Sequence, residues 1–200
     1  MPHRYWHSRI AAFHADETRV IERTRIRGLP AQIASDCRVL VLGSMPGVAS
    51  LQATQYYAHA RNRFWPLMSR LLAVEGNSYQ DRLAKLHGAG VGLWDVIGEC
   101  ARVGSLDAAI ERTSIVPNPL PECLAGLGHL RAVACNGAEA HRLWQRWIAP
   151  RLSLNASALP VLALPSTSPA NAAFGLERLL DAWRPVLDYL PAPSPSPPPR

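Results

Sequence analysis

The sequence predicts an α/β fold in which a parallel sheet is covered by helices on both faces. Short apolar runs alternate with segments of helical periodicity four times along the chain, an order typical of parallel βαβ units. The runs are apolar at consecutive positions, as expected for strands that are buried on both faces. The 200 residues suffice for one domain with a sizeable core, and no internal repeat divides them.

The individual elements follow from these runs. The strands are predicted at 38–43, 90–95, 130–136 and 159–165. The helices are predicted at 62–73, 81–86, 138–148 and 171–184, and the first of them has apolar residues at helical spacing. Pro185 is expected to end the last helix, and the prolines near the ends of the fourth strand are tolerable there.

Three regions differ in composition. Residues 1–36 are expected to form a basic N-terminal extension, partly helical, because four arginines gather near its end. Residues 37–190 are predicted to form the globular domain. Residues 191–200 are rich in proline and predict a disordered or polyproline-like tail, since such a composition cannot pack a core.

Composition narrows the class of protein. The net charge is +6, which favours polyanionic partners such as nucleic acid. Lys85 is the only lysine, however, and a GC-rich genome gives the same arginine bias. No apolar stretch is long enough to span a membrane, and residues 1–9 are not a secretory signal, so we expect a cytoplasmic protein. The cysteines form no C-x-x-C pair, which argues against a zinc site or a disulfide framework and predicts buried reduced thiols; they are Cys37, Cys100, Cys123 and Cys135.

The unusual loops of the sequence all begin where a predicted strand ends. They start at Ser44, at Trp94-Asp95, at Asn136-Gly137 and at Pro165. In parallel sheets, ligands bind beyond the carboxyl ends of the strands. We therefore expect these loops to converge on one face and to form one site.

The first of these loops carries a distinctive motif. Gly43-Ser44-Met45-Pro46-Gly47 is followed by a segment, 55–65, that packs two tyrosines, a histidine, an asparagine and a Phe-Trp pair into eleven residues. Loops are seldom so aromatic without a binding role. Phe64 and Trp65 have an alternative interpretation, as the core face of the helix that begins there.

These residues resemble the uracil-DNA glycosylase superfamily. The closest similarity is to the hypoxanthine (deoxyinosine) DNA glycosylase family, and the stretch from Asn62 to Trp65 is also similar to mismatch-specific uracil/thymine glycosylases. A second motif, 164–171, precedes the last helix. The resemblance covers roughly residues 38–184. It implies a three-layer α/β/α sandwich with a four-stranded parallel sheet, and glycosidic hydrolysis without a metal or a cofactor.

Two positions depart from the superfamily pattern. Many members carry an Asp or Asn that positions water two places after the opening glycine of the motif, where this chain has Met45. In the hypoxanthine branch that role is expected to pass to Asn62. Ala60 stands where proline is common in this branch, which we expect to loosen the loop without changing the chemistry.

The chemistry assigns a role to each candidate residue. The target nucleotide must be flipped out of the duplex, and the glycosidic bond breaks through an oxocarbenium-like state. Asn62 is the candidate to orient the water, although it is also a good N-cap for a helix beginning at Arg63. Backbone N–H groups of the loop are expected to bind the base, with Phe64 stacked on it and Tyr57 as a wall. Trp94 and Asp95 are expected in the same pocket, although Asp95 can equally cap a helix.

Three further groups remain with open alternatives. His59 is a candidate general acid, or else a phosphate contact or a brace of the loop. The loop before the last helix is expected to bind phosphate or to wedge into the duplex; it comprises Ser166, Thr167, Ser168, Pro169, Ala170 and Asn171. Asn136 is expected to form an Asn-Gly turn or to contact base or backbone.

The expected function is therefore removal of a deaminated base, chiefly hypoxanthine, from double-stranded DNA by a monomeric enzyme. The alternatives are a uracil glycosylase that acts at mispairs, a DNA-binding relative without activity, and a nucleotide-binding α/β protein. Met45 speaks against the first of these, and the absence of a G-x-G-x-x-G motif or a P-loop speaks against the last.

Overall fold

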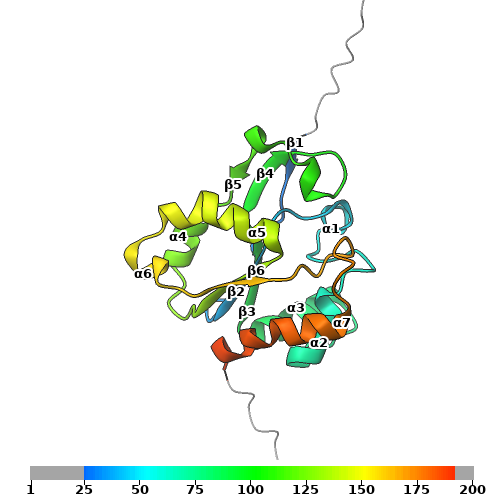
Figure 1. Cartoon of the computed structure of the whole chain (residues 1–200). Helices are drawn as coiled ribbons and strands as arrows, with labels where there is room; N and C mark the ends of the chain where they lie inside the picture. The colour runs from blue at the N-terminus through cyan, green and yellow to red at the C-terminus, as the bar shows by residue number, and fades with distance from the viewer. Residues whose placement is uncertain (1–24, 192–200) are drawn as a thin grey trace, which may run out of the picture.

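The computed structural model describes residues 25–191, which form three layers around a parallel sheet (Figure 1). The sheet has four strands in the order β3-β2-β6-β7, and every neighbouring pair is parallel. The strands are β2 (Val39–Gly43), β3 (Val91–Asp95), β6 (Ala132–Asn136) and β7 (Val161–Leu164). The predicted fold class, an α/β/α sandwich around a four-stranded parallel sheet, is confirmed.

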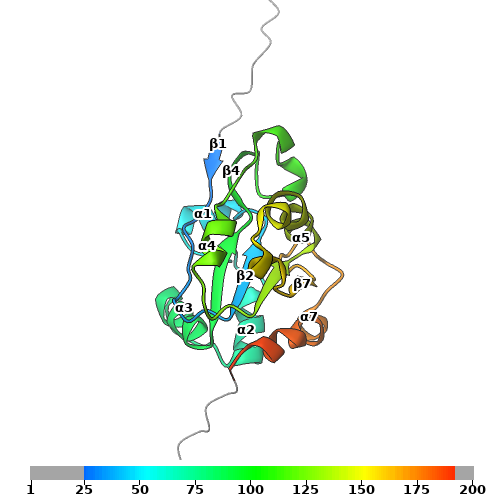
Figure 2. The same ribbon diagram turned by 90° about the vertical axis from the view of Figure 1, so that its left-hand side faces the viewer.

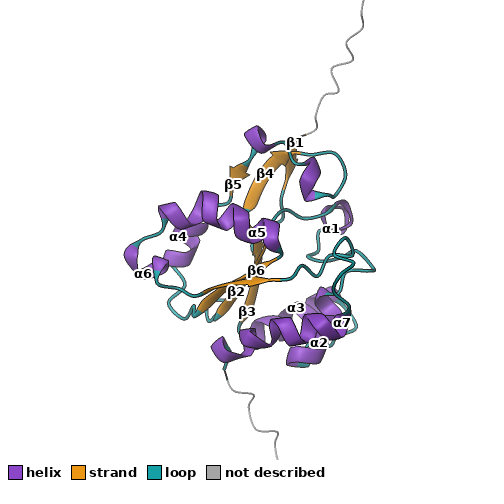
Figure 3. Ribbon diagram, viewed as in Figure 1, coloured by secondary structure: helices purple, strands orange, loops and turns teal. Residues whose placement is uncertain are grey.

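Helices cover both faces of the sheet (Figure 3). One face carries α2 (Phe64–Leu72), α3 (Tyr79–Gly88) and α7 (Leu176–Trp183). The other face carries α4 (Leu120–Ala125), α5 (Ala138–Leu143) and α6 (Leu154–Ser157). The short helix α1 (Val48–Ala53) follows β2 directly and lies beside the loops on one side of the molecule.

Strand β2 shows why two cores form. Val39 and Val41 are fully buried in the core with α2, α3 and α7, while Leu40 and Leu42 are fully buried in the core with α4 and α5. Successive side chains of a strand point to opposite faces of the sheet. The unbroken apolar run in the sequence therefore supplies both cores at once.

A second, antiparallel sheet was not predicted. It contains β1 (Arg25–Arg27), β4 (Ile97–Ala101) and β5 (Val116–Pro117) in the order β1-β4-β5. Figure 2 shows β1 and β4 at one end of the molecule, above the main sheet. These strands are short and pair with partners that are distant in the sequence, so no local sequence pattern predicts the sheet.

Because of this second sheet, the domain starts earlier in the chain than the sequence predicted. The sequence placed a boundary at residue 36, but β1 pairs with β4, and Gln32 forms a bridge with Leu93 of β3. Residues 25–36 therefore contact the domain as part of its structure. The rest of the predicted extension, residues 1–24, and residues 192–200 of the predicted tail lie outside the described residues.

The last helix begins later than predicted but ends close to the predicted residue. It starts at Leu176 instead of residue 171. In the preceding loop, the carbonyls of Asn171 and Phe174 accept hydrogen bonds from the Arg63 side chain instead of from N–H groups of a helical turn. The α-helix ends at Trp183, just before Pro185 as predicted, and the chain then continues as a 3-10 helix over Arg184–Tyr189, whose first turn accepts a proline.

Two other helices also differ in their bounds. The helix predicted at 138–148 is α-helical only to Leu143 and continues as a π-helix over Trp144–Ile148, which buries Trp144 and Ile148. The helix predicted at 81–86 spans Tyr79–Gly88, because Ser78 and Asp81 form a capping box that starts it two residues earlier.

The cysteines agree in part with the prediction of buried reduced thiols. All four cysteines are free, and three of them are buried: Cys37, Cys100 and Cys135. Burial raises the pKa of the Cys37 thiol to about 11, so this thiol stays protonated at neutral pH. Between residues 25 and 191, no helix is long and apolar enough to cross a membrane.

Trp183 links α7 to the end of β7 and gives a test of the packing. Its side chain is fully buried, and its Nε1 donates to the carbonyl of Pro165 at 3.0 Å. Trp183→Phe leaves that carbonyl without its donor, so we expect the free energy of unfolding to fall by about 1–3 kcal/mol in urea titrations. Trp147→Phe is the matched control, because Trp147 Nε1 has no hydrogen-bond partner in the described part of the chain. Equal losses in the two variants would show that the Pro165 bond does not matter.

Candidate active site

A cavity of about 230 Å³ opens at the carboxyl ends of the parallel strands. Residues at or after the end of each strand of the main sheet line it, together with Ser105 and Asp107 of the segment after β4. The residues that line it and that the sequence singled out are Gly43, Ser44, Met45, Pro46, Gly47, Tyr57, His59, Asn62, Asp95, Asn136, Gly137, Ser166, Thr167, Ser168 and Pro169. The loops thus converge, as expected from the sequence. Phe64, Trp94, Ala170 and Asn171 do not line the cavity.

The loop after β2 contains backbone N–H groups without a partner among the described residues. Met45 and Gly47 both line it, and within residues 25–191 neither N–H group donates a hydrogen bond to another residue. The Met45 side chain is buried and packs in the core with α4 and α5, so it offers the cavity no polar atom. This half of the motif therefore offers main-chain groups, not a catalytic side chain.

Asp95, at the end of β3, is the acid of the cavity floor. Its side chain is 4% exposed, and its Oδ2 has no hydrogen-bond partner among the described residues. A Cβ added to Gly43 would lie only 2.4 Å from Asp95 Oδ1, which explains why glycine must end β2. Asp95 does not cap a helix, since β4 begins two residues later.

The environment of Asp95 shifts its titration. Burial raises the pKa of this carboxyl to about 7; the nearby hydroxyl of Tyr56 opposes the shift, Asp107 adds to it, and the charge of Arg102 opposes it. The carboxyl is therefore close to half protonated at neutral pH. Strongly shifted acids in a concave site are candidates for function.

Asn62 lies in the wall formed by the second half of the first motif. Helix α2 begins at Phe64 with Arg63 at the N-cap position, so the cap predicted for Asn62 is displaced by one residue. Asn62 Oδ1 nevertheless accepts from the N–H of Phe64 at 3.0 Å. A carbonyl oxygen has a second lone pair, so this bond fixes the amide without using all of its acceptor capacity.

Tyr57 occupies the place expected for Phe64. Its ring stacks on Phe64 at a centroid distance of 4.0 Å and lines the cavity, while Phe64 is fully buried behind it. The prediction that Phe64 stacks on a base is therefore wrong for this structure, because Phe64 belongs to the core against Trp65 and Trp183. Tyr57 has a φ of 56°, a left-handed conformation that costs a non-glycine residue free energy and is often found at functional sites.

Trp94 also belongs to the packing and not to the cavity. Its ring is partly buried against both cores of the domain. Successive residues of a strand face opposite sides, so Trp94 and Asp95 cannot both point the same way. The prediction that Trp94 lines the base pocket is wrong for this reason.

Asn136 and His59 act as braces. Asn136 Nδ2 donates to Thr167 Oγ1 at 3.0 Å, and its Oδ1 accepts from the N–H of Thr167 at 2.9 Å. Both ends of this amide therefore hold the loop after β7. His59 is exposed, and its Nδ1 accepts from the N–H of Arg61 at 3.1 Å, which favours the brace among the roles considered for it.

Arg63 ties the two motifs together. Its side chain donates to the carbonyls of Thr167, Ser168, Asn171 and Phe174. The N–H of Arg63 also donates to the carbonyl of Thr167 at 3.0 Å. The shape of the loop before α7 thus depends on a side chain more than 100 positions earlier. Bonds to a charged donor are the stronger class of hydrogen bond.

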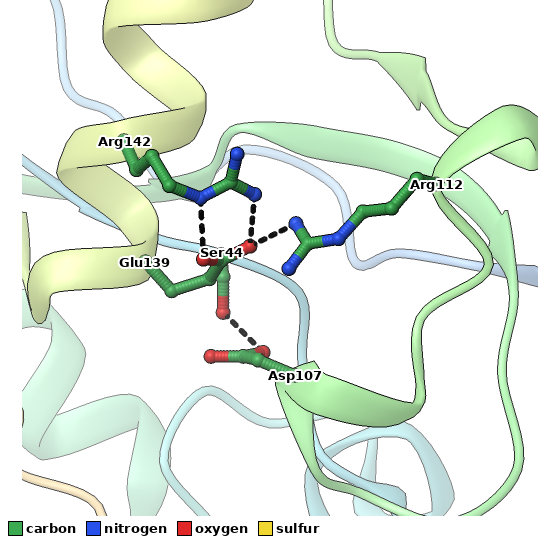
Figure 4. Close-up of polar contacts among 5 residues, drawn as sticks. All are labelled: Ser44, Asp107, Arg112, Glu139 and Arg142. Carbon is green, nitrogen blue, oxygen red and sulfur yellow. Dashed lines mark hydrogen bonds and ion pairs between the residues drawn. The ribbon is translucent and has the colours of Figure 1, made fainter.

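The far wall of the cavity contains acids that the sequence did not reveal. Ser44 Oγ donates to Asp107 Oδ1 at 2.7 Å, and Glu139 lies between Arg112 and Arg142 (Figure 4). Burial raises the pKa of Asp107, and the bond from Ser44 opposes this. Burial opposes ionisation of Glu139 too, but hydrogen bonds from Arg142 and Arg112 leave its pKa below the ordinary value. Asp107 and Glu139 belong to no sequence motif. Glu139 could have been suspected because it lies just after the end of β6, whereas nothing in the sequence pointed to Asp107.

The structure describes no metal centre. Between residues 25 and 191, no group of three or more His, Cys, Asp or Glu side chains is placed to hold a metal ion. The site therefore consists of an amide, a carboxyl with a raised pKa, a tyrosine ring and main-chain donors around a cavity.

The comparisons with known proteins agree on one family. The family described as the uracil DNA glycosylase superfamily matches residues 30–197. A hypoxanthine DNA glycosylase of Methanosarcina acetivorans is 30% identical over 154 residues, which are 76% of this chain and 92% of that protein. A hypoxanthine DNA glycosylase of Methanosarcina barkeri is 36% identical over 91 residues, 44% of this chain and 58% of that protein.

A solved structure has the same architecture. The solution NMR structure of a Methanosarcina acetivorans protein, provisionally described as a uracil DNA glycosylase, has a TM-score of 0.66 to this chain at 27% sequence identity. The match covers 82% of this chain and 99% of that one.

The raised pKa of Asp95 predicts a pH-dependent stability. Because the folded protein holds this proton up to about pH 7 and the unfolded chain releases it near the ordinary carboxyl pKa of 3.8, the free energy of unfolding falls as pH rises between these values. Asp95→Asn removes the buried charge, so it should stabilise the protein by about 2–4 kcal/mol at pH 8 and far less at pH 4. Urea titrations at both pH values measure this. Asp188→Asn, at an exposed carboxylate, is the control; an Asp95→Asn effect of equal size at both pH values would contradict the prediction.

Proposed function

The chain belongs to the uracil DNA glycosylase superfamily, and we propose on that premise that it is a monofunctional DNA glycosylase of base excision repair. Its proposed substrate is a deaminated base in double-stranded DNA, chiefly hypoxanthine. The enzyme hydrolyses the N-glycosidic bond without a metal or a cofactor, as a monomer in the cytoplasm. The two relatives that are named hypoxanthine DNA glycosylases support this choice of base.

The observation that carries the proposal is a set of unpartnered polar groups on residues that line the cavity. The N–H groups of Met45 and Gly47 are free donors, and Asp95 Oδ2 is a free acceptor in the described structure. Hypoxanthine carries a carbonyl oxygen next to a ring N–H, which needs a donor and an acceptor side by side. Adenine has the reverse pattern, an amino donor next to a ring acceptor, so this set favours hypoxanthine over the adenine from which deamination forms it.

The size of the cavity fits one flipped base. Its volume of about 230 Å³ lies below the ~300 Å³ at which pockets for drug-sized ligands begin. The nucleotide must leave the stack to reach it, which costs a few kcal/mol and less for a mispaired base. Tyr57, whose ring lines the cavity, would stack on the base, a contact worth on the order of 1–3 kcal/mol.

Asn62 is proposed to hold the attacking water. The transition state has positive charge on the sugar and a largely broken bond, so a well-placed water suffices without a strong base. The bond from the N–H of Phe64 fixes the amide, and the remaining lone pair of Oδ1 accepts from the water. The departing base gains negative charge, which the N–H groups of Met45 and Gly47 stabilise.

The loop 166–171 is proposed to contact the DNA backbone. Its residues Ser166, Thr167 and Ser168 line the cavity, and Arg63 and Asn136 fix its shape. Hydroxyl and N–H groups held in this way suit phosphate oxygens. His59 and Arg61 are exposed on the neighbouring loop and would extend the same contact.

A substrate panel tests the proposed function. Duplexes that carry hypoxanthine, uracil, xanthine or no lesion are incubated with the protein, and abasic sites are then cleaved with alkali. Asp95 and the loop N–H groups match the lactam edge that hypoxanthine shares with uracil and xanthine. We expect the fastest strand scission with hypoxanthine, because the two relatives are named hypoxanthine DNA glycosylases. Faster scission with uracil would assign the chain to the mispair-directed uracil enzymes, and no scission on any duplex would overturn the glycosylase proposal.

Asn62 variants test the mechanism. Asn62→Ala removes the water-holding oxygen, so we expect kcat to fall about 100-fold or more, the scale of a lost positioning group, while binding to the hypoxanthine duplex is retained. Asn62→Asp keeps an acceptor oxygen for the Phe64 N–H and should retain more activity than Asn62→Ala. Asn155→Ala, at an exposed asparagine of α6, is the control. Near-normal turnover by Asn62→Ala would remove Asn62 from the scheme.

A further inference from the structure

The pocket loop, residues 44–47, is held from one side by β4 and by the residue that follows β4. The carbonyl of Ser44 accepts from the N–H of Ile97 at 3.0 Å, and the carbonyl of Pro46 accepts from Nη2 of Arg102. Both donor residues are buried and lie outside the lining of the cavity, which includes all four residues of the loop. The two carbonyls therefore point from the loop toward the interior of the protein.

The planar peptide bond links the direction of each carbonyl to that of the next N–H group. In a trans peptide unit the two groups point in opposite directions, and the described residues contain no cis peptide bond. The carbonyl of Ser44 shares its unit with the N–H of Met45. The carbonyl of Pro46 shares its unit with the N–H of Gly47. Carbonyls held on the interior side thus turn both N–H groups away from β4, and neither group donates to another residue within 25–191.

Arg102 is a buried cation that makes few contacts of its own. Its side chain is 5% exposed, and its Nε and Nη1 have no hydrogen-bond partner in the described part of the chain. Burial of a charged group with unpaired N–H groups is unfavourable for stability. The bond from its Nη2 to Pro46 therefore indicates a role in the geometry of the pocket loop and not in the stability of the domain.

Other bonds to the pocket loop leave one peptide unit to Arg102. Asp107 Oδ1 accepts from Ser44 Oγ at 2.7 Å, and Ser105 Oγ accepts from the N–H of Val48 at 2.9 Å. Figure 1 shows the green segment after β4 beside α1, which follows the loop. These bonds fix a side chain and the start of α1. Among residues 25–191, only Arg102 bonds to the unit that joins Pro46 to Gly47.

We propose that Arg102 is a positioning residue, which directs the N–H of Gly47 into the cavity by holding the carbonyl of Pro46. The inference rests on the proposed function, in which this N–H stabilises the negative charge of the departing base. A donor that is already aimed when the charge develops costs no reorganisation during the reaction. The two donors of the loop differ in their support, since Met45 depends on a backbone bond to β4 and Gly47 on a side chain. A substitution of Arg102 can therefore disturb one donor and spare the other.

Backbone order parameters from NMR relaxation test this in the free protein. In the wild type, the amides of Met45 and Gly47 should both have S² of about 0.85, the value of rigid backbone. Arg102→Met keeps the apolar stem but donates no hydrogen bond, so S² of Gly47 should fall below about 0.6, while that of Met45 is retained. Arg102→Lys keeps a donor and should preserve both. Arg151→Met is the matched control and should change neither, because Arg151 also donates to a backbone carbonyl, that of Trp147, outside the cavity lining.

Single-turnover rates on a hypoxanthine duplex give a second measurement. Arg102→Met should cleave about 10- to 100-fold more slowly, since the loss of such a donor costs about 100-fold or more and the N–H of Gly47 is misdirected instead of removed. The affinity for the duplex should stay unchanged, because the loop 166–171 is unaltered. Arg102→Lys should recover much of the rate. Leu124→Ala opens the core beneath α4, outside the cavity lining, and should lower Tm without slowing cleavage.

The outcomes separate this inference from the proposed function. An unchanged S² of Gly47 in Arg102→Met would overturn the inference, whether or not the enzyme is active. A wild-type rate despite the loss of order would also overturn it, because the direction of the N–H would then not matter. A rate that falls equally in Leu124→Ala would assign the effect to stability and have the same consequence. If the wild type releases no base, the proposed function fails, whereas the order parameters still decide whether Arg102 holds the peptide unit.

Discussion

The guanidinium of Arg63 is the contact on which the geometry of the site depends. It donates to four carbonyls of the loop before α7, and those carbonyls would otherwise have to find partners in a helix or in water. The loop therefore stays open until Leu176, where α7 begins. Because Asn62 precedes Arg63 directly, the same anchor that shapes this loop also fixes the place of the candidate catalytic amide.

The floor of the cavity shows the opposite physical situation, a polar group that is left without a partner. Asp95 is buried with an unpaired Oδ2, and its pKa is raised to about 7. Such a carboxyl is unfavourable for stability, and Gly43 has to lack a side chain to make room for it. An unpaired buried acid in a concave site is a candidate for a ligand contact, which agrees with the base proposed for this cavity.

The small antiparallel sheet contributes residues to the candidate site as well as to the fold. Strand β4 leaves β3 after Val96 and carries the chain to Arg102, which bonds to Pro46 of the pocket loop. Asp107 and Ser105 then return to the cavity from this second sheet. The candidate site is therefore built from both sheets, although its recognisable motifs come only from the parallel one.

The sequence by itself determined the parallel sheet, the order of its helices and the convergence of the loops, because these follow from local periodicity and from the rule that parallel strands end on one side. It also identified Asn62, Asp95 and the loop after β2 as residues of one pocket. The sequence also predicted Tyr57 as a wall of this pocket, and only the tertiary structure decided that Phe64 is buried behind it and that Trp94 packs in the core. It alone placed Asp107 and Glu139 in the far wall and Arg63 against a loop more than 100 positions away. The reason is physical: periodicity reports which side of an element is buried, whereas the choice of partner across a cavity depends on contacts between segments that no local pattern encodes.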